Sequence, residues 1–211
     1  MTIKQQLLRR GVRQFHHPTG AAGHLAGWVM GRRSSNVARN RWAVDLLDVQ
    51  PTERVIEVGC GPGVAIFALA ARADQGLVVG VDHSPVVLAQ AARRNKTAIG
   101  TGRVCLVNAP VERLPVLAGP FDAALAVNTV GMWPDPPGRL VDLGRLLRPG
   151  GRIALVSQPR CPGATAATTA AAADELASGL VRAGFEQQRV ETLELQPPVA
   201  CVLATRGADR E

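Results

Sequence analysis

The feature that most constrains the fold is a short apolar run that leads directly into three alternating glycines, at residues 55–64 (VIEVGCGPGV). The first four residues are apolar except for Glu57, as in a buried strand that ends near a carboxylate. The glycines that follow remove side chains that would hold a ligand away from the backbone: Gly59, Gly61 and Gly63. The pattern predicts a strand, an open turn and the start of a helix, arranged around a small ligand.

The glycine spacing differs from that of a dinucleotide-binding turn. That turn reads G-x-G-x-x-G and brings a pyrophosphate to the amides of a helix N-terminus. This chain reads E-x-G-x-G-x-G, so that Glu57 stands two residues before the first glycine. A carboxylate there repels a pyrophosphate and attracts a ligand with an ammonium and a sulfonium, such as S-adenosylmethionine. The spacing and the absence of tyrosine both disfavour an NAD-dependent oxidoreductase.

Four further motifs follow in order, and the five together resemble the class I S-adenosylmethionine-dependent methyltransferases, most closely the ubiquinone and menaquinone methyltransferases. The second motif, VVGVD, ends in Asp82, near the offset of roughly 20 residues at which an acid binds ribose hydroxyls. The other three motifs are assigned to strand three with the adenine loop (104–115), strand four (121–128), and strand five with the turn before it (147–151 and 152–158). The resemblance covers about residues 53–158.

The resemblance implies an α/β, Rossmann-like class I methyltransferase fold. It comprises a mostly parallel seven-stranded sheet, helices on both faces and a C-terminal antiparallel hairpin. Strand signals that alternate with helix-length segments also favour a parallel sheet. An alanine-rich helix is predicted at 169–183 with Gly184 as its cap, and the hairpin strands at 186–195 and 200–205.

Three parts of the chain are expected. Residues 1–48 form an N-terminal helical cap or lid, 49–206 the methyltransferase domain and 207–211 a tail. One or two helices are predicted within 24–48, with one apolar stripe formed by Ala38, Trp42 and Leu46. Because only a short linker follows strand five, we expect the lid over the site to come from the N-terminus.

Cofactor binding is assigned by the resemblance to the carboxyl ends of the strands, where open α/β sheets bind ligands. Asp82 and His83 are expected at the ribose. The Val111 amide is expected at the adenine, because Pro110 stands where relatives often carry an acid. The full expected set is Glu57, Gly59, Cys60, Gly61, Gly63, Asp82, His83, Val111, Glu112 and Asn128. The expected cofactor is S-adenosylmethionine, which leaves as S-adenosylhomocysteine, and no metal is expected.

The chemistry needs few catalytic groups, because the sulfonium methyl is already electrophilic. Holding the acceptor in line with the carbon–sulfur bond can supply roughly 7 to 11 kcal/mol. His17 and His24 are the candidate bases if the lid covers the site, and Asn128 is a candidate for orienting a polar acceptor.

Acceptor contacts are predicted in the lid and after strands four and five. An apolar wall is assigned to Trp28, Met30, Met132 and Trp133, and an anion contact to Arg160. Ordinary packing is the alternative for the apolar residues, and a solvated side chain is the alternative for the arginine. The expected partner is a small-molecule methyl acceptor.

The net charge of +7 is concentrated in the first 44 residues, which contain Lys4, seven arginines and no acid. This segment fits an anionic substrate, a nucleic-acid backbone or peripheral contact with an anionic membrane. A solvated helical face explains the charge equally well.

An RNA or DNA methyltransferase is the second hypothesis. The sequence DPPG at 135–138 looks like the D/N-P-P-Y/F motif of amino-directed enzymes. It stands well after Asn128, however, and precedes a predicted helix at 138–147, so its prolines are interpreted as helix-entry residues. With 3% aromatic residues the chain also offers little for base stacking. A non-catalytic S-adenosylmethionine-binding module remains a further alternative.

The four cysteines have neither C-x-x-C spacing nor histidine partners at zinc-like intervals. They are interpreted as reduced, packed thiols: Cys60, Cys105, Cys161 and Cys201. The chain has no apolar run of membrane-span length and no signal-peptide core at its start, so a cytoplasmic location is expected.

Overall fold

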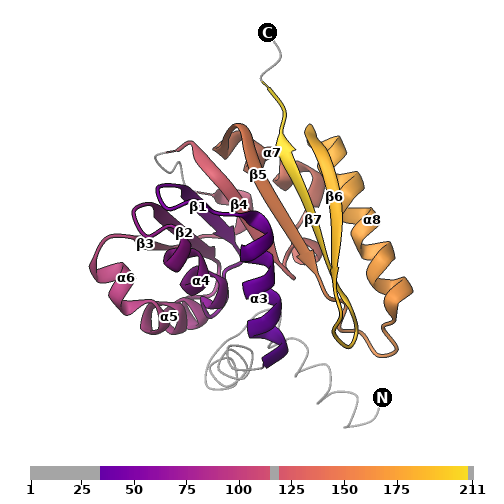
Figure 1. Ribbon diagram of the computed structural model, residues 1–211, viewed down its shortest axis with the longest axis horizontal. Coiled ribbons are helices and arrows are strands. Elements are labelled where there is room, and N and C mark those ends of the chain that lie inside the picture. Colours follow the sequence, from indigo (N-terminus) through magenta and orange to yellow (C-terminus); the bar gives the residue numbers. More distant parts are fainter. Residues whose placement is uncertain (1–33, 115–118, 209–211) are drawn as a thin grey trace.

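The computed structural model describes residues 34–114 and 119–208. They form a seven-stranded sheet in the order β3-β2-β1-β4-β5-β7-β6 (Figure 1). Strands β1 to β5 pair in parallel, while β7 is antiparallel to both β5 and β6. The predicted parallel sheet with a C-terminal antiparallel hairpin is confirmed.

The strands are β1 (Arg54–Val58), β2 (Leu77–Asp82), β3 (Val104–Asn108), β4 (Phe121–Val127), β5 (Leu147–Ser157), β6 (Phe185–Leu193) and β7 (Val199–Arg206). The described helices are α3 (Ser34–Leu47), α4 (Val64–Arg72), α5 (Pro85–Arg94), α6 (Lys96–Gly100), α7 (Pro136–Leu146) and α8 (Ala166–Arg182). Two short 3₁₀ turns are η1 (Val111–Arg113) and η2 (Val130–Met132).

Two apolar layers lie on opposite faces of the sheet. Helices α3 to α6 cover one face, and α7 and α8 cover the other. Side-chain alternation along β1 shows the division, since Val55 packs in the first layer and Ile56 in the second. Each fully buried branched side chain contributes roughly 1.5–3 kcal/mol, so this two-sided burial holds the parallel strands together.

Helix α3 buries a different stripe from the one predicted. Ala38 is exposed, and Trp42 and Leu46 are only partly buried. The buried side is formed by Asn36, Arg39, Asn40, Ala43, Val44 and Leu47. The apolar pattern was misleading because two polar side chains near the helix start point inward and are hydrogen-bonded there. Because its C-terminal half packs in the core, α3 is part of the main folded unit and not a separate layer.

Strand β5 begins earlier than predicted. The sequence predicts a turn at 147–151 before the strand, but β5 already starts at Leu147. Leu147 pairs with Phe121 and Arg152 pairs with Ala123, so the extra residues of β5 form a bulge against β4. Gly150 has φ +72°, a backbone conformation that favours glycine.

The C-terminal third follows the prediction closely. Helix α8 begins at a capping box formed by Thr165 and Thr168, and Gly184, at φ +82°, follows its end. Strands β6 and β7 then form the hairpin that closes the sheet edge beside β5. Of the helices in the described ranges, none has the length and apolar character needed to cross a bilayer.

The four cysteines are free thiols, as predicted, but they are not all packed. Cys60 and Cys201 are buried, whereas Cys105 and Cys161 are exposed. Cys105 is an exposed position on edge strand β3, and Cys161 lies in the loop after β5. The sequence could not separate the two pairs, because exposure here depends on the sheet edge and on an irregular loop.

Candidate active site

The glycine turn after β1 is held by hydrogen bonds from its own backbone to the end of β2. The amides of Gly59 and Cys60 donate to the Val81 carbonyl at 2.8 and 3.0 Å. The Gly61 amide donates to Oδ2 of Asp82 at 2.9 Å. Three consecutive amides therefore fix the turn to the neighbouring strand before any ligand binds.

The three glycines are required for different reasons. A Cβ on Gly59 would lie 2.3 Å from Oγ1 of Thr129, and one on Gly63 would lie 2.7 Å from Nδ2 of Asn95. Both glycines also have positive φ, so they allow the turn to pack against the loop after β4 and the end of α5. A Cβ on Gly61, by contrast, would have no atom within 4 Å. Gly61 is therefore the glycine that faces open space.

Asp82 joins the turn to the loops on either side of it. Its Oδ1 accepts from the Ser84 amide at 2.9 Å, and its carbonyl accepts from the Ala109 amide at 3.1 Å. The carboxylate has about four lone-pair sites, so the two backbone donors leave acceptor capacity for ribose hydroxyls. The imidazole of His83 is exposed, with Nδ1 3.7 Å from Oδ1 of Asp82.

Glu57 lies inside the protein, beneath the turn. It is 2% exposed, and its Oε2 has no hydrogen-bond partner among the described residues. Desolvation, reinforced by the nearby Asp82 carboxylate, raises the pKa of Glu57 well above its ordinary value, and the Ile66 amide at the start of α4 opposes this. The sequence suggested a charged carboxylate at an open strand end. In the structure Glu57 is buried instead, and a cationic ligand would stabilise its ionised form.

Cys60 is a packed residue of the turn. It is 4% exposed, and burial followed by the charges of Glu57 and Asp82 raises the pKa of its thiol well above the ordinary value. A thiol held protonated is a poor nucleophile, which supports the interpretation of this cysteine as packing.

The predicted adenine side lies at the carboxyl end of β3. Val111 and Glu112 begin the short turn η1, directly after Pro110. Val111 is partly buried against the second apolar layer, and Glu112 is exposed. This placement beside the end of β2 brings them to the same edge as Asp82, and their contacts with adenine remain predictions.

Asn128 connects β4 to β5 at their carboxyl ends. Its amide donates to the Val156 carbonyl at 2.8 Å, and its Oδ1 accepts from the Gln158 amide at 2.7 Å. These contacts hold it at φ +55°, a conformation that asparagine tolerates better than most residues. Its Nδ2 donates to no described residue, so this side of the amide remains for a ligand.

The two predicted wall residues after β4 differ in exposure. Met132 is 46% exposed. Trp133 is 8% exposed, packs in the second apolar layer and donates from its indole Nε1 to Oγ1 of Thr129 at 3.1 Å. A packing role is favoured for Trp133, whereas a role for Met132 at the acceptor stays a prediction.

Arg160 belongs to a cluster that the sequence did not reveal. Its Nη2 donates to Oε1 of Gln158 at 3.0 Å, and Nη1 of Arg39 donates to the same oxygen at 2.6 Å. Gln158 Nε2 in turn donates to the Pro197 carbonyl at 2.8 Å. No local sequence pattern indicates this cluster, because Arg39 and Gln158 are 119 positions apart. Thr129 and Asn95, which pack against the glycine turn, were missed for the same reason.

The predicted lid residues are not placed. His17, His24, Trp28 and Met30 lie outside the described residues, as do 209–211 of the predicted tail. Their assignments remain predictions.

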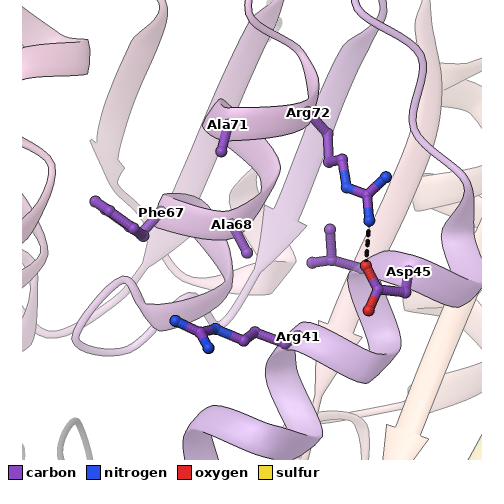
Figure 2. Close-up of a pocket in the computed structure, with 7 residues that line it drawn as sticks. Arg41, Asp45, Phe67, Ala68, Ala71 and Arg72 are labelled. Carbon is purple, nitrogen blue, oxygen red and sulfur yellow. Dashed lines mark hydrogen bonds and ion pairs between the residues drawn. The ribbon is translucent and has the colours of Figure 1, made fainter.

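A surface pocket of about 240 Å³ lies between α3 and α4, away from all the predicted site residues (Figure 2). Figure 2 shows Asp45 and Arg72 in an ion pair of 2.5 Å at one side of it and Phe67 at the other. It is lined by Arg41, Val44, Asp45, Phe67, Ala68, Ala71 and Arg72. Its lining includes neither the glycine turn nor the acids Glu57 and Asp82, so the glycine turn is kept as the candidate active site. Within residues 34–114 and 119–208, no three His, Cys, Asp or Glu side chains gather as a metal ion would need.

The parallel sheet, the glycine turn and the acids at the ends of β1 and β2 define a class I, Rossmann-like nucleoside-cofactor site. The sequence profile of a family described as "Methyltransferase domain" matches residues 55–151. The uncharacterized methyltransferase YdaC of Bacillus subtilis (strain 168) is 28% identical over 185 residues, covering 87% of this chain and 99% of YdaC. The sequence matches and the fold support a class I S-adenosylmethionine-dependent methyltransferase.

Two further comparisons extend this result. The demethylmenaquinone methyltransferase of Thermus thermophilus is 34% identical over 137 residues, which cover 64% of this chain and 61% of that protein. The N-methyltransferase NodS of Bradyrhizobium japonicum, solved with S-adenosyl-L-homocysteine, shares the fold at a TM-score of 0.68 and 14% identity, over 86% of this chain and 92% of NodS. The chain thus spans less than two thirds of the first of these proteins and nearly all of the second.

Proposed function

We propose that this methyltransferase methylates a small molecule by in-line displacement at the carboxyl ends of β1, β4 and β5. The observation that carries the proposal is the open face of Gly61, between two acids on one side and Asn128 on the other. The sheet reverses its order between β1 and β4, and open α/β sheets bind ligands at such a point. The similarity to a demethylmenaquinone methyltransferase also supports a small-molecule acceptor.

The residues at the glycine turn fit S-adenosylmethionine. A turn without side chains at Gly61 lets a ligand reach the backbone, and the unpartnered buried oxygen of Glu57 suits a cationic one. Asp82 and His83 would hold the ribose, and Val111 and Glu112 the adenine. When bound, the cofactor supplies an electrophilic methyl group on a sulfonium. The remaining expected members of the set (Gly59, Cys60, Gly63 and Asn128) shape the turn and its far side.

The chain's own groups then have a limited task. Asn128 orients a polar acceptor through its Nδ2, which donates to none of the described residues, while its Oδ1 stays bonded to the Gln158 amide. Positioning accounts for most of the acceleration, and no described histidine is required as a base. His17 and His24 remain the candidates for an oxygen or nitrogen acceptor that must lose a proton.

The proposal is tested with methyl-labelled S-adenosylmethionine and a cell extract separated into small-molecule, nucleic-acid and protein fractions. We expect label in the small-molecule fraction, and none when Gly61→Asp replaces the natural enzyme. Label that accumulates in RNA, DNA or protein would contradict the proposal and favour the nucleic-acid hypothesis or a protein acceptor. Tight binding of S-adenosylhomocysteine with no label in any fraction would favour the non-catalytic module.

A further inference from the structure

We propose that Arg39, Gln158 and Arg160 form an anion subsite, and that the methyl acceptor carries a carboxylate, sulfate or phosphate group which binds there. The inference rests on the proposed function, because it assigns the chemical class of the small molecule that the same site methylates. Arg160 would contact the anion, and Arg39 would act behind it as a positioning residue.

The cluster presents two positive charges to one neutral oxygen. Gln158 is 5% exposed, and its Nε2 is committed to the Pro197 carbonyl. This contact turns Oε1 toward the guanidinium groups of Arg39 and Arg160, at 2.6 and 3.0 Å. The neutral amide therefore brings the two guanidinium groups side by side.

Arg39 lacks the compensation that a buried cation normally has. Its side chain is 5% exposed, it pairs with no carboxylate among residues 34–114 and 119–208, and its Nε has no hydrogen-bond partner there. Burial, followed by the charge of Arg160, lowers the pKa of Arg39 from its ordinary value to about 10. Buried charges in proteins are generally paired, so an uncompensated one at a ligand-binding edge indicates a counter-ion from outside the chain.

Other arginines of the same protein show the usual arrangement. Arg152, on the same strand that leads to Gln158, pairs with Glu53 at 2.5 Å. Arg148 pairs with Asp122 at 2.7 Å. Both lie at the opposite end of the sheet, at the start of β5, where no ligand is expected. Arg152 and Arg148 thus have carboxylate partners, whereas Arg39, at the ligand edge, has none among residues 34–114 and 119–208.

The position of the cluster suits the acceptor better than the cofactor. Gln158 follows β5 and is joined to Asn128 after β4, whereas Asp82 and the glycine turn lie at the ends of β2 and β1. The site therefore has an acidic half for a cationic sulfonium and a basic half one or two strands away. A planar guanidinium binds oxyanions with paired hydrogen bonds, and a basic site also attracts anions from a distance.

The methionine carboxylate of the cofactor is the other source of the same chemistry. The two sources differ in what an Arg160 substitution changes. If the acceptor supplies the anion, Arg160→Gln leaves the affinity for S-adenosylhomocysteine within about twofold. If the cofactor supplies it, that affinity falls about tenfold or more, the loss expected for a charged hydrogen bond, and our proposal is wrong.

The direct experiment measures thermal unfolding of the full chain, saturated with S-adenosylhomocysteine, in sodium sulfate and in sodium chloride of equal ionic strength. We expect sulfate at tenfold its Kd to raise the Tm by about 3–6 °C in the natural protein and not in Arg160→Gln. Arg72→Gln is the matched control, since it removes the same charge from an exposed surface site and should keep the shift. Equal sulfate shifts in all three proteins would overturn the subsite.

Arg39 is tested by a pair of substitutions. Arg39→Lys keeps the charge and should retain a sulfate shift, while Arg39→Gln should lose it even where both variants lose some stability. A purely structural Arg39 would instead give the two variants the same sulfate shift as the natural protein.

The labelled product provides the second test. We expect the labelled small molecule to be retained on an anion-exchange resin, and Arg160→Gln to lower its yield about tenfold or more at limiting extract. A neutral or cationic labelled product would refute the anion subsite and leave the proposed function standing. Label in a macromolecular fraction would refute the proposed function itself.

Discussion

The two halves of the ligand edge are built in different ways. At the ends of β1 and β2, backbone amides of one tight turn bond to Val81 and Asp82, and the charged side chains are acids. At the ends of β4 and β5, side chains bond to one another through Gln158, and the charged ones are arginines. This difference indicates that the cofactor half of the site depends on backbone shape. The acceptor half depends on side chains, which can vary on the same scaffold.

The largest effect is expected at the backbone half, from Gly61→Asp. The new side chain enters the open space next to the turn and adds a third acid, so we expect S-adenosylhomocysteine affinity to fall about 100-fold or more, roughly 2.8 kcal/mol. The fold should persist, because aspartate tolerates positive φ.

Gly102→Asp is the matched control for that variant. Gly102 also has positive φ and an open Cβ position, but it lies just before the amino end of β3, away from the carboxyl ends of the strands. Titration calorimetry and circular dichroism should show normal affinity and a native spectrum. Unchanged affinity in Gly61→Asp would show that the cofactor is not held at this turn.

Gly59→Ala tests whether the backbone half depends on close packing against β4. The added methyl group would overlap Thr129, at 2.3 Å from its Oγ1, in a backbone conformation that disfavours alanine. We expect a loss of about 1–3 kcal/mol in the free energy of unfolding, measured with urea. Thr129→Ala in the same chain should recover part of it, and strictly additive losses would argue against a direct contact.

Glu57→Gln separates stability from binding. The raised pKa of Glu57 means that the folded protein binds this proton more tightly than the unfolded chain. Its unfavourable contribution is therefore absent below the ordinary pKa of 4.5 and grows as the pH rises toward the folded value. We expect the variant to have a higher Tm than the natural protein at pH 7–8, with the difference vanishing near pH 4.5.

The same variant should bind the cofactor more weakly. Loss of an acid below the turn is expected to lower the affinity for S-adenosylmethionine about tenfold, roughly 1.4 kcal/mol, and to affect a neutral analogue such as adenosine less. Equal losses for both ligands would mean that Glu57 acts through the shape of the turn and not through its charge.

The smallest effect is expected at the acceptor half, from Trp133→Phe. The phenyl ring keeps most of the apolar contact but removes the hydrogen bond to Thr129, which is worth about 1 kcal/mol. We expect the Tm to fall by about 2–4 °C and the KM for the acceptor to stay the same. A raised KM with unchanged Tm would restore Trp133 to the acceptor wall.

Much of the fold could be predicted because its signals are local. A parallel strand buried on both faces is a continuous apolar run, and the turn requires glycine at Gly59 and Gly63 for reasons of conformation and space. Helix entry at Pro136 is equally local, since proline suits the first turn of a helix and Asp135 caps it. These features involve residues that are near one another in the chain.

The features that could not be predicted depend on long-range contacts. The inward stripe of α3 is polar at Arg39 because Gln158 stands opposite, and the β5 bulge exists because Phe121 and Ala123 set the register from another strand. The burial of Glu57 likewise depends on α4 and on two flanking strands.

The class of ligand can be inferred from the sequence alone, because a glycine turn and two spaced acids specify the ligand's shape and charge within short stretches of chain. The folded structure is needed to establish which groups of the site are buried, which are paired and which are uncompensated. Burial and pairing arise when distant segments come into contact in a medium of low polarity, and no local pattern of residues indicates that contact.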